Sequence, residues 1–561
     1  MKLSKTHLLA SSVVSTMLLL AGCGGGNNAT TADAQKTDAA STEAVNATPK
    51  ATAPTPAGKI GVNLASGAEP ESLDPHKSSD AASFDIMRQM LIGLTTSDST
   101  GATIPSAAES WTNVDEKVWT FKLRDANWSN GDPLTAHDFV YSLQRLTDPK
   151  TGSPYASYLV DAKVLNAFEV TEGKAGVEAL GVKALDDKTL EITLSEPVPY
   201  FPDLLTLPVT YAVNKKAVET HGDKWVEPAN YVVSGAYKLK DWVVNSHITI
   251  EKNPSYYDAA NTKIAEASFL PVSGSAAVNR YKVDELDVVG VPPEQIEKLK
   301  AEHGDEMHAS PRLCTFYLEH NNAKAPFDDV RVRRAISLVI DRETLADKVI
   351  KRGEKATYQF TPPAIQGMGE VNVEWKAWDK AKRAEEAKKL LTEAGYSAEK
   401  PLKFEILYST SEMAKLITTA ASAMIKEELG GMAEASPINQ EWKTMLSTRR
   451  EGKYNTAFAG WCSDYNEPST FLNVMRSGNS NNTGKYSNPE FDKLLEQTVK
   501  AGLTPADRIK LYHEAELIMD KDAAIAPVYT GVSLRLVKPY LQADSLADPS
   551  GNYQIKDWEL R

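Results

Sequence analysis

The chain of 561 residues is too long for one hydrophobic core, so two or three lobes are expected. Its apolar and charged fractions, 42% and 24%, are those of an ordinary globular protein, and its 10 Trp and 21 Tyr exclude a largely disordered chain. The net charge of −13 argues against nucleic acid as a partner and favours cationic ligands.

The first residues have the pattern of an export signal. Lys2 and Lys5 precede an apolar stretch, residues 8–20, which is too short to span a bilayer as a permanent helix. The small residues that follow, and then Cys23, resemble the bacterial lipoprotein cleavage motif. This resemblance implies a signal peptide of residues 1–22 and a lipid on Cys23, and two or more acyl chains would anchor the protein stably. An ordinary signal peptide that contains a cysteine is the alternative.

The segment after Cys23 has the composition of a linker. Residues 24–58 are mostly Gly, Asn, Ala, Thr, Asp and Pro, without an aromatic residue. Because such a segment cannot bury an apolar face, residues 23–58 are predicted to be a flexible tether. No later segment reaches transmembrane length.

Three cysteines are present in the chain. With Cys23 lipidated, Cys314 and Cys462 remain as an even pair in an oxidising compartment. A disulfide between them would close a long loop, a constraint of about 4–5 kcal/mol in the chain-entropy model. The sequence alone leaves this pairing open.

The mature fold is predicted to mix strands and helices without regular alternation. Thr135 and Asp138 have the spacing of a capping box at the start of a helix, and Gly395 is placed to end another. Because strict βαβ alternation is missing, the chain is predicted to form α+β lobes. The expected strands cover residues 60–64, 118–123, 189–194, 248–250, 267–270 and 402–407, and the expected helices cover 84–93, 135–146, 330–350, 384–391 and 413–429.

A search for catalytic motifs finds none. The nine histidines form no HExxH pair, and the chain has neither a GxxxxGK[ST] loop nor a GxSxG elbow. One SxxK match, residues 397–400, lacks the companion motifs. We therefore expect no enzyme, no metal and no cofactor.

One stretch, residues 458–468, has the composition of a binding surface. Gly460 permits close backbone approach, Trp461 and Tyr465 offer large faces with polar tips, and Asp464 supplies a negative charge. We predict that this stretch holds the charged amino end of a peptide. The alternative is a strand end and loop with a core tryptophan and a surface acid.

Several stretches together resemble one family, the periplasmic oligopeptide-binding proteins of peptide ABC transporters. They occur in the same order over most of the chain, from about residue 60 to the C-terminus. The stretches are EPESLDPHK (69–77), WTFKLRDANWSNGDPLTAHDFVYSLQRL (119–146), SPYASYL (153–159), LSEPVPYF (194–201), VNRY (278–281), LCTFYLEHNN (313–322), NQEWKTMLSTRREGKYN (439–455) and GWCSDYNEPSTFLN (460–473).

The resemblance implies a two-lobed periplasmic-binding fold that closes over an extended peptide. It implies a monomer in the bacterial cell envelope, delivering peptides to a membrane permease and touching the membrane through its lipid anchor only. The implied parts are lobe I (59–91, 215–313 and 530–561), a subdomain inserted in lobe I (92–214) and lobe II (314–529). A binder of murein-derived peptides or another small ligand is the main alternative, and a surface lipoprotein for adhesion or signalling is a further one.

The resemblance also implies roles for individual residues. Asp464 would pair with the peptide's α-ammonium, and Cys314 and Cys462 would form the family's disulfide. Trp442 and Trp461 would wall side-chain pockets, although a core position is the alternative for both. The remaining implied residues are Gly460, Cys462 and Tyr155 for the peptide main chain, Tyr317, Asn481 and Tyr529 for the cleft, and Arg449 for a ligand carboxylate, with a surface ion pair as the alternative for Arg449.

Three positions depart from the family pattern. Phe458 replaces a second pocket arginine, Ala414 replaces a histidine near the ligand's carboxyl end, and Ser79 replaces an acidic residue. Two positive groups that could bind peptide carboxylates are therefore missing. We predict that length preference or ligand class differs from that of the general binder; a more apolar peptide, a murein-derived peptide, or a ligand whose carboxylate meets only Arg449 would fit.

Overall fold

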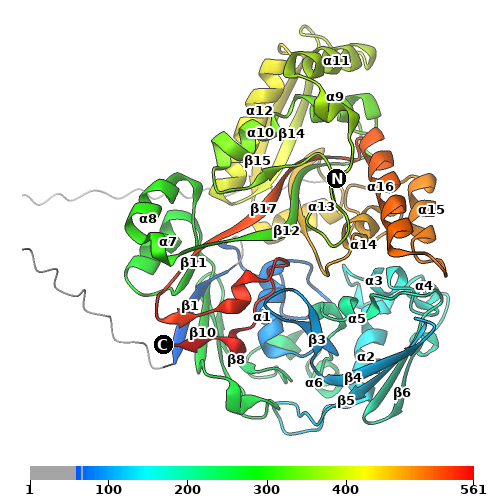
Figure 1. Ribbon diagram of the computed structural model, residues 1–561, viewed down its shortest axis with the longest axis vertical. Helices are drawn as coiled ribbons and strands as arrows, with labels where there is room; N and C mark the ends of the chain where they lie inside the picture. Colours follow the sequence, from blue (N-terminus) through cyan, green and yellow to red (C-terminus); the bar gives the residue numbers. More distant parts are fainter. Residues whose placement is uncertain (1–57, 65–66) are drawn as a thin grey trace, which may run out of the picture. The chain divides into compact units, whose positions relative to one another are not determined.

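A computed structural model describes residues 58–64 and 67–561 of the chain (Figure 1). The predicted signal peptide, the predicted lipidation site Cys23 and almost all of the predicted tether lie outside these residues. One large sheet of 11 strands runs through the described part. In spatial order its strands are β15 (Ala433–Gln440), β14 (Leu402–Ser409), β16 (Thr456–Cys462), β12 (Met307–His320), β17 (Ile525–Val537), β11 (Val288–Gly290), β1 (Lys59–Asn63), β10 (Glu266–Leu270), β9 (His247–Lys252) and β8 (Tyr237–Val243), with β13 (Lys355–Ala356) beside β17.

The long antiparallel strands β12 and β17 connect the two halves of this sheet (Figure 1). Near one end they pair as Met307 with Leu536, and near the other as Glu319 with Ile525. The ladder shifts register between Pro311 and Thr315, where the strands pass from one half to the other. Each half packs its own large apolar cluster, so the sheet serves two lobes that these two strands join.

A separate four-stranded antiparallel sheet follows the first part of the chain. Its order is β4 (Ala108–Val114), β5 (Val118–Leu123), β7 (Thr189–Thr193) and β6 (Val182–Asp186). In β5 the alternating residues Trp119, Phe121 and Leu123 are buried, as the sequence predicts for one face of a strand. Two small pairs of strands, β2 (Thr95–Ser97) with β3 (Thr103–Pro105) and β18 (Leu541–Gln542) with β19 (Glu559–Leu560), complete the described sheets.

Local sequence signals set the ends of several helices. The capping box of Thr135 and Asp138 starts α2, which buries Phe139, Leu143 and Leu146 against the four-stranded sheet, while Val140 is only partly buried. The longer helices are α1 (Ala81–Met90), α2 (Ala136–Thr147), α7 (Gly274–Lys282), α8 (Ile296–His303), α9 (Val330–Val339), α11 (Lys380–Glu393), α12 (Glu412–Glu428), α13 (Trp442–Arg450), α15 (Pro489–Gln497) and α16 (Pro505–Lys521). Short helical turns are α3 (Tyr158–Asp161), α4 (Ala167–Thr171), α5 (Phe201–Leu204), α6 (Lys215–His221), α10 (Arg342–Thr344) and α14 (Ser469–Leu472).

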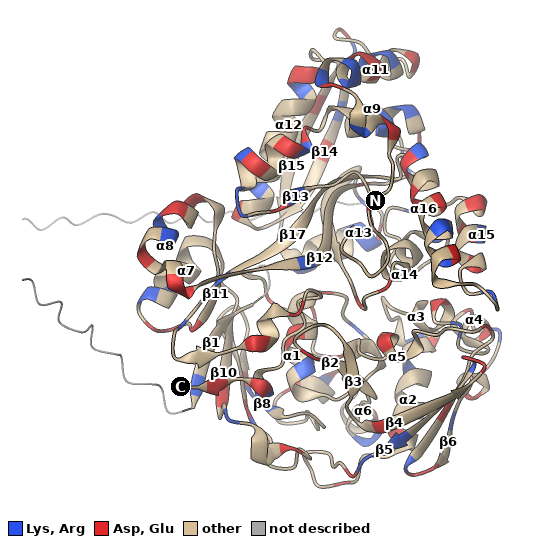
Figure 2. Ribbon diagram, viewed as in Figure 1, with Lys and Arg blue, Asp and Glu red and all other residues tan. Residues whose placement is uncertain are grey.

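Helix α11 ends as the sequence predicts. Gly395 has φ +88°, and its N–H donates to the carbonyl of Thr392 while Tyr396 N–H donates to Leu391. This left-handed residue satisfies the last carbonyls of the helix. Both signs of charge alternate along α11 (Figure 2), which is typical of a solvent-facing helix.

The prediction for α1 was wrong by three residues. A helix was expected over residues 84–93, but α1 covers Ala81–Met90. Asp80 is its N-cap, because the Asp80 carboxylate accepts a hydrogen bond from Ser83 N–H at 3.0 Å. The backbone of Leu91 is already in an extended conformation, so the last apolar residues of the run, Leu91 and Ile92, lie beyond the end of the helix.

Candidate functional site

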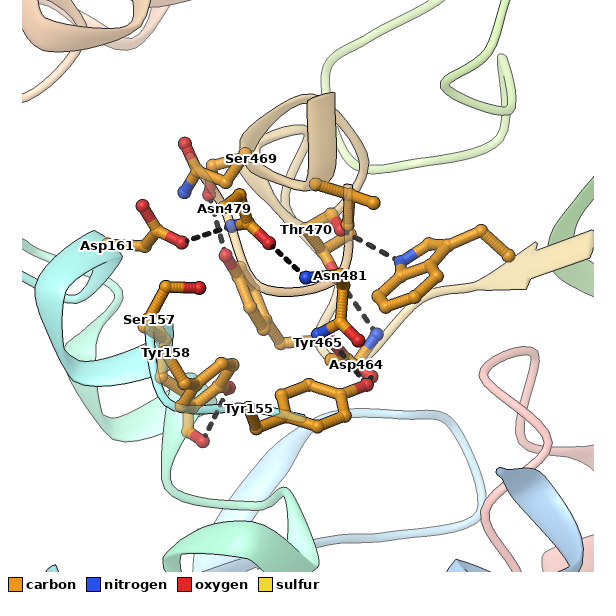
Figure 3. Close-up of a pocket in the computed structure, with 14 residues that line it drawn as sticks. Tyr155, Ser157, Tyr158, Asp161, Asp464, Tyr465, Ser469, Thr470, Asn479 and Asn481 are labelled. Carbon is orange, nitrogen blue, oxygen red and sulfur yellow. Dashed lines mark hydrogen bonds between the residues drawn. The ribbon is translucent and has the colours of Figure 1, made fainter. Parts of the chain in front are cut away.

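Asp464 lies in the loop that follows β16, and Thr470 fixes that loop at two points. The backbone N–H of Asp464 donates to Thr470 Oγ1 at 2.9 Å, and Trp461 Nε1 donates to the Thr470 carbonyl at 3.0 Å (Figure 3). The end of the strand and the first turn of α14 therefore hold both the indole of Trp461 and the carboxylate of Asp464 in place.

The carboxylate of Asp464 faces a tyrosine from the other side of the cleft. The Tyr155 hydroxyl donates to its two oxygens at 3.3 and 3.4 Å (Figure 3). Burial raises the pKa of Asp464 to about 7, although the positive charge of Arg88 and the Tyr155 hydrogen bond both act to lower it. No lysine or arginine within residues 58–64 and 67–561 forms an ion pair with Asp464. The site therefore holds a partly buried carboxylate without a cationic partner, which is an arrangement that suits a cationic ligand group.

A small cavity adjoins Asp464 and collects residues from distant parts of the chain (Figure 3). Four of the residues predicted from the sequence line it: Tyr155, Trp461, Asp464 and Asn481. Tyr465, which the sequence predicts to lie on the binding surface of residues 458–468, also lines it. The sequence did not single out the other lining residues, which are Ser157, Tyr158, Asp161, Leu204, Ser469, Thr470, Asn473, Val474 and Asn479.

Hydrogen bonds join the two sides of this cavity. Asp161 accepts from Arg476 at 2.8 Å and from Asn479 at 2.7 Å, and the hydroxyls of Ser157 and Ser480 are 2.9 Å apart. Segments about 320 residues apart in the chain are thus held together. The sequence carries one signal of these contacts, the polar run from residue 476 to 482, whose composition is that of an ordinary loop.

Strand β16 presents an edge without a strand partner beside the cavity. Its neighbour β14 pairs only with Thr456 and Ala457. From Phe458 to Cys462, the edge that faces away from β12 has no strand beside it among the described residues. Gly460, in the middle of this stretch, is exposed. Free backbone groups on such an edge can bond an added strand.

The disulfide prediction is confirmed. Cys314 and Cys462 are bonded with an S–S distance of 2.04 Å and lie opposite each other in the β12–β16 ladder. Cys314 lies within the register shift of β12, so the bond ties the free-edged strand to the point where β12 passes between lobes.

Arg449 is already paired with a carboxylate of the protein. Its guanidinium donates two hydrogen bonds to Glu319, at 2.9 and 3.1 Å, and Glu319 is buried while Arg449 is partly buried. Tyr454 and Thr483 add hydrogen bonds of 2.7 and 2.8 Å to the same carboxylate. Although burial acts to raise the pKa of Glu319, Arg449 and these bonds hold it below its ordinary value.

The remaining predicted residues lie outside the Asp464 cavity. Tyr317 is buried and packs edge-on against Phe360, with ring centroids 5.2 Å apart. Tyr529 is buried and stacks on Phe316, and Trp442 begins α13 with its side chain partly buried.

Within the described residues, no group of three or more His, Cys, Asp or Glu side chains is placed to hold a metal ion. No helix in the same residues has both the length and the apolar character needed to cross a membrane. The carboxylates at the cleft are instead bound by hydroxyl, amide and arginine groups of the protein.

Comparison with known proteins gives a consistent result. The profile of the family described as "Bacterial extracellular solute-binding proteins, family 5 Middle" matches residues 102–483. The periplasmic oligopeptide-binding protein OppA of Salmonella typhimurium is 50% identical over 495 residues, which cover 88% of this chain and 91% of that protein. Two solved structures each cover 90% of this chain.

The first of these structures is Haemophilus influenzae OppA in complex with RPPGFSPFR, with a TM-score of 0.87, 44% identity and 99% of that chain covered. The second is the Escherichia coli murein tripeptide binding protein MppA, with a TM-score of 0.87, 37% identity and 98% of that chain covered. The chain belongs to the bacterial extracellular solute-binding proteins of family 5, and within it to the group of the periplasmic oligopeptide-binding proteins.

Proposed function

We propose that the protein binds oligopeptides outside the cytoplasm, in the cleft between its lobes, and delivers them to the permease of an ABC transporter. The observation that carries this proposal is the carboxylate of Asp464, which has no cationic partner among the described residues and follows a strand whose edge is free within them. The relatives named for oligopeptide binding and the peptide complex of one of them point the same way.

The ligand is held at its amino end and along its backbone. Its α-ammonium pairs with Asp464, which removes the energetic cost of a buried carboxylate without a counter-charge. Its main chain bonds the edge of β16 at Gly460 and Cys462, assisted by Tyr155. Because these main-chain bonds are the same for every peptide, and because water molecules adapt to different side chains, many sequences can bind.

The other proposed contacts are carried by side chains. Trp442 and Trp461 wall side-chain pockets, and Tyr317, Asn481 and Tyr529 line the cleft. Arg449 is the proposed contact for a ligand carboxylate. Since Glu319 already binds its guanidinium, a ligand carboxylate would have to join this ion pair or displace Glu319.

We propose a division of the chain into two lobes, connected by β12 and β17, and an inserted subdomain. Lobe I comprises residues 59–91, 215–313 and 530–561, the inserted subdomain comprises 92–214, and lobe II comprises 314–529. Closure is a rotation of one lobe against the other about the two connecting strands, without covalent chemistry, cofactor or metal. The protein acts as a monomer, and it is not an enzyme.

The proposed location is the bacterial cell envelope, on its periplasmic side. Residues 1–22 act as the signal peptide, Cys23 carries the lipid, and residues 23–58 tether the lobes to the membrane. Globomycin, which inhibits lipoprotein signal peptidase, tests this directly. An accumulating precursor that retains residues 1–22 supports the assignment, and normal processing contradicts it.

A murein-derived peptide is the second candidate ligand, since MppA has the same TM-score as the OppA complex. An affinity-selection experiment separates the two. Ligand-free protein is incubated with a mixed library of tri- to nonapeptides together with murein tripeptide, and the bound species are identified by mass. Retention of many linear peptides supports the proposal, and retention of murein tripeptide alone overturns it in favour of the second candidate.

A further inference from the structure

Aromatic side chains cover one face of the sheet next to the free edge of β16. Gly460 lies opposite Phe316 in the β12–β16 ladder, and Phe316 in turn lies opposite Tyr529 of β17. Phe458 is two residues from Gly460, so its side chain is on the same face of the sheet. The side chains of Phe316, Phe458 and Tyr529, called the aromatic row below, therefore share one face of the three strands.

The rings of the aromatic row are stacked on one another. The ring centroids of Phe316 and Tyr529 are 4.8 Å apart with an interplanar angle of 16°, and those of Phe316 and Phe458 are 6.2 Å apart with an angle of 20°. Tyr529 and Phe458 are buried, whereas Phe316 is partly exposed. Phe316 is therefore the member that its neighbours hold in position and that keeps surface open to a ligand.

Gly460 allows the Phe316 ring to lie across β16. A Cβ atom built on Gly460 would be 2.7 Å from Cδ1 and 2.8 Å from Cε1 of Phe316, closer than real contacts allow. The ring thus occupies the space that a side chain at position 460 would fill. It extends toward the edge that has no strand beside it among the described residues. The residue of an added strand that pairs with Gly460 would bring its side chain against this ring, because the Cβ positions of directly paired residues on neighbouring strands are about 4.5–5.5 Å apart.

The amino end of the ligand sets its direction along this edge. With the α-ammonium at Asp464, which follows Cys462 in the chain, the peptide must run back toward Phe458 and therefore antiparallel to β16. Alternate side chains of an extended peptide then point to the face of the aromatic row. This step depends on the proposed function.

Among the described residues, the charged groups that act on Tyr529 are paired with each other. The charged groups that influence Tyr529 are Glu354 and Arg352, whose Oε1 and Nε atoms lie 3.7 Å apart and neutralise each other. A charged ligand side chain at this level would lose water without gaining a partner, which is costly. An apolar or aromatic side chain would instead gain contact with Phe316.

We infer that the peptide residue beside Gly460 is selected for an apolar or aromatic side chain, and that Phe316, held by Phe458 and Tyr529, is the residue that makes this selection. This narrows the ligand class from oligopeptides in general to those with an apolar residue at one defined interior position. It also disfavours murein-derived peptides, which carry additional carboxylates.

The test is a positional scan by calorimetry on ligand-free protein. Pentapeptides of alanine carry a single Phe, Leu, Lys or Glu at each position in turn. At one interior position, the pentapeptides with Phe or Leu are expected to bind about tenfold or more tighter than those with Lys or Glu. A second position with the same preference, if there is one, should lie two residues away. Equal affinities at every interior position, or a preference for Glu, would overturn the inference. If pentaalanine itself does not bind, the proposed function fails as well.

Two variants test whether the aromatic row is responsible for the preference for an apolar ligand side chain. Phe316→Ala is expected to abolish the gain in affinity that Phe gives over pentaalanine at the selected position. Phe458→Leu is a milder change and is expected to reduce this gain in affinity. It provides the test if the Phe316→Ala variant does not fold. Phe168→Ala serves as the matched control, because Phe168 is 50% exposed on α4. Retention of the full gain in both aromatic-row variants would contradict the assignment to Phe316.

Discussion

Tyr155 and Asp464, 309 residues apart in the chain, meet through a hydrogen bond of 3.3 Å. The hydroxyl is the only hydrogen-bond donor that reaches the Asp464 carboxylate from another side chain among the described residues. A neutral donor reduces the cost of burying this charge but does not balance it. This imbalance is the basis of the first three predictions.

Replacing Asp464 by Asn should abolish the preference for a charged amino end. Removal of one partner of a buried ion pair costs about 3–5 kcal/mol, so the Kd of a free peptide should rise at least about 100-fold. Calorimetry with a free peptide and its N-acetylated form measures this. Acetylation should weaken binding to the unaltered protein strongly and to Asp464→Asn hardly at all; equal acetylation effects in both would contradict the pairing.

The affinity for peptide should depend on pH with a maximum near pH 7–8. Burial raises the pKa of Asp464 to about 7 in the free protein, and an adjacent ammonium lowers it, so binding releases a proton below pH 7. Affinity should therefore rise from pH 5 to pH 7, and fall above pH 8 as the free peptide's amino group, with a pKa of about 7.7–8.0, loses its proton. A flat profile between pH 5 and 7 would contradict this account.

The same carboxylate should destabilise the free protein at high pH. Because its folded pKa, about 7, exceeds its ordinary value of 3.8, the folded state binds more protons than the unfolded state between these values. Stability from Asp464 is thus lost as pH rises from about 4 to 7. Asp464→Asn should have the higher Tm at pH 8 and nearly the same Tm at pH 4. A lower Tm for Asp464→Asn than for the unaltered protein at pH 8 would show that other groups of the protein already balance the charge of the Asp464 carboxylate.

Loss of Arg449 should affect stability more than ligand binding. Arg449→Ala leaves the buried carboxylate of Glu319 uncompensated, which should lower the free energy of unfolding by about 3–5 kcal/mol at pH 7. The pKa of Glu319 is lowered, so its contribution is present above its ordinary value of 4.5 and is lost as pH falls. The Tm difference should therefore shrink below pH 4.

A carboxyl-amidated peptide separates the two roles of Arg449. If Arg449 acts only within the protein, the affinity ratio of free-acid to amidated peptide is unchanged in Arg449→Ala. A ratio that collapses to one in the variant would show that Arg449 binds a ligand carboxylate, as the family resemblance implies.

Breaking the disulfide should loosen the strand that binds the ligand. Cys314→Ser with Cys462→Ser should lower the free energy of unfolding by about 2–5 kcal/mol, measured by denaturant unfolding. Peptide affinity should also fall, because Cys462 lies on the free edge of β16. Unchanged affinity in the folded double variant would show that β16 is held in place by its ladder with β12 alone.

Local features of the fold could be predicted from the sequence because they depend on neighbouring residues. The capping box of Thr135 and the left-handed Gly395 are such features. The start of α1 was placed three residues too late because Asp80 was not recognised as its N-cap. An apolar run marks the buried face of a helix but not its first residue.

Much of the site depends on contacts between distant segments. Asp464, Trp461 and the disulfide were predicted, the disulfide only through the family resemblance. The hydrogen bond of Asp161 to Arg476 and the ion pair of Arg449 with Glu319 could not be predicted, because they join residues 315 and 130 positions apart. A resemblance aligns single positions, whereas the partner of a charged side chain is set by the packing of the lobes.

The most direct test of the central claim is native mass spectrometry of the protein as purified, with the Asp464→Asn variant beside it. We expect a heterogeneous set of bound small peptides on the unaltered protein and the loss of these peptides from the variant. One homogeneous ligand that is not a linear peptide, or an empty protein that also ignores added peptides, would contradict oligopeptide binding at Asp464.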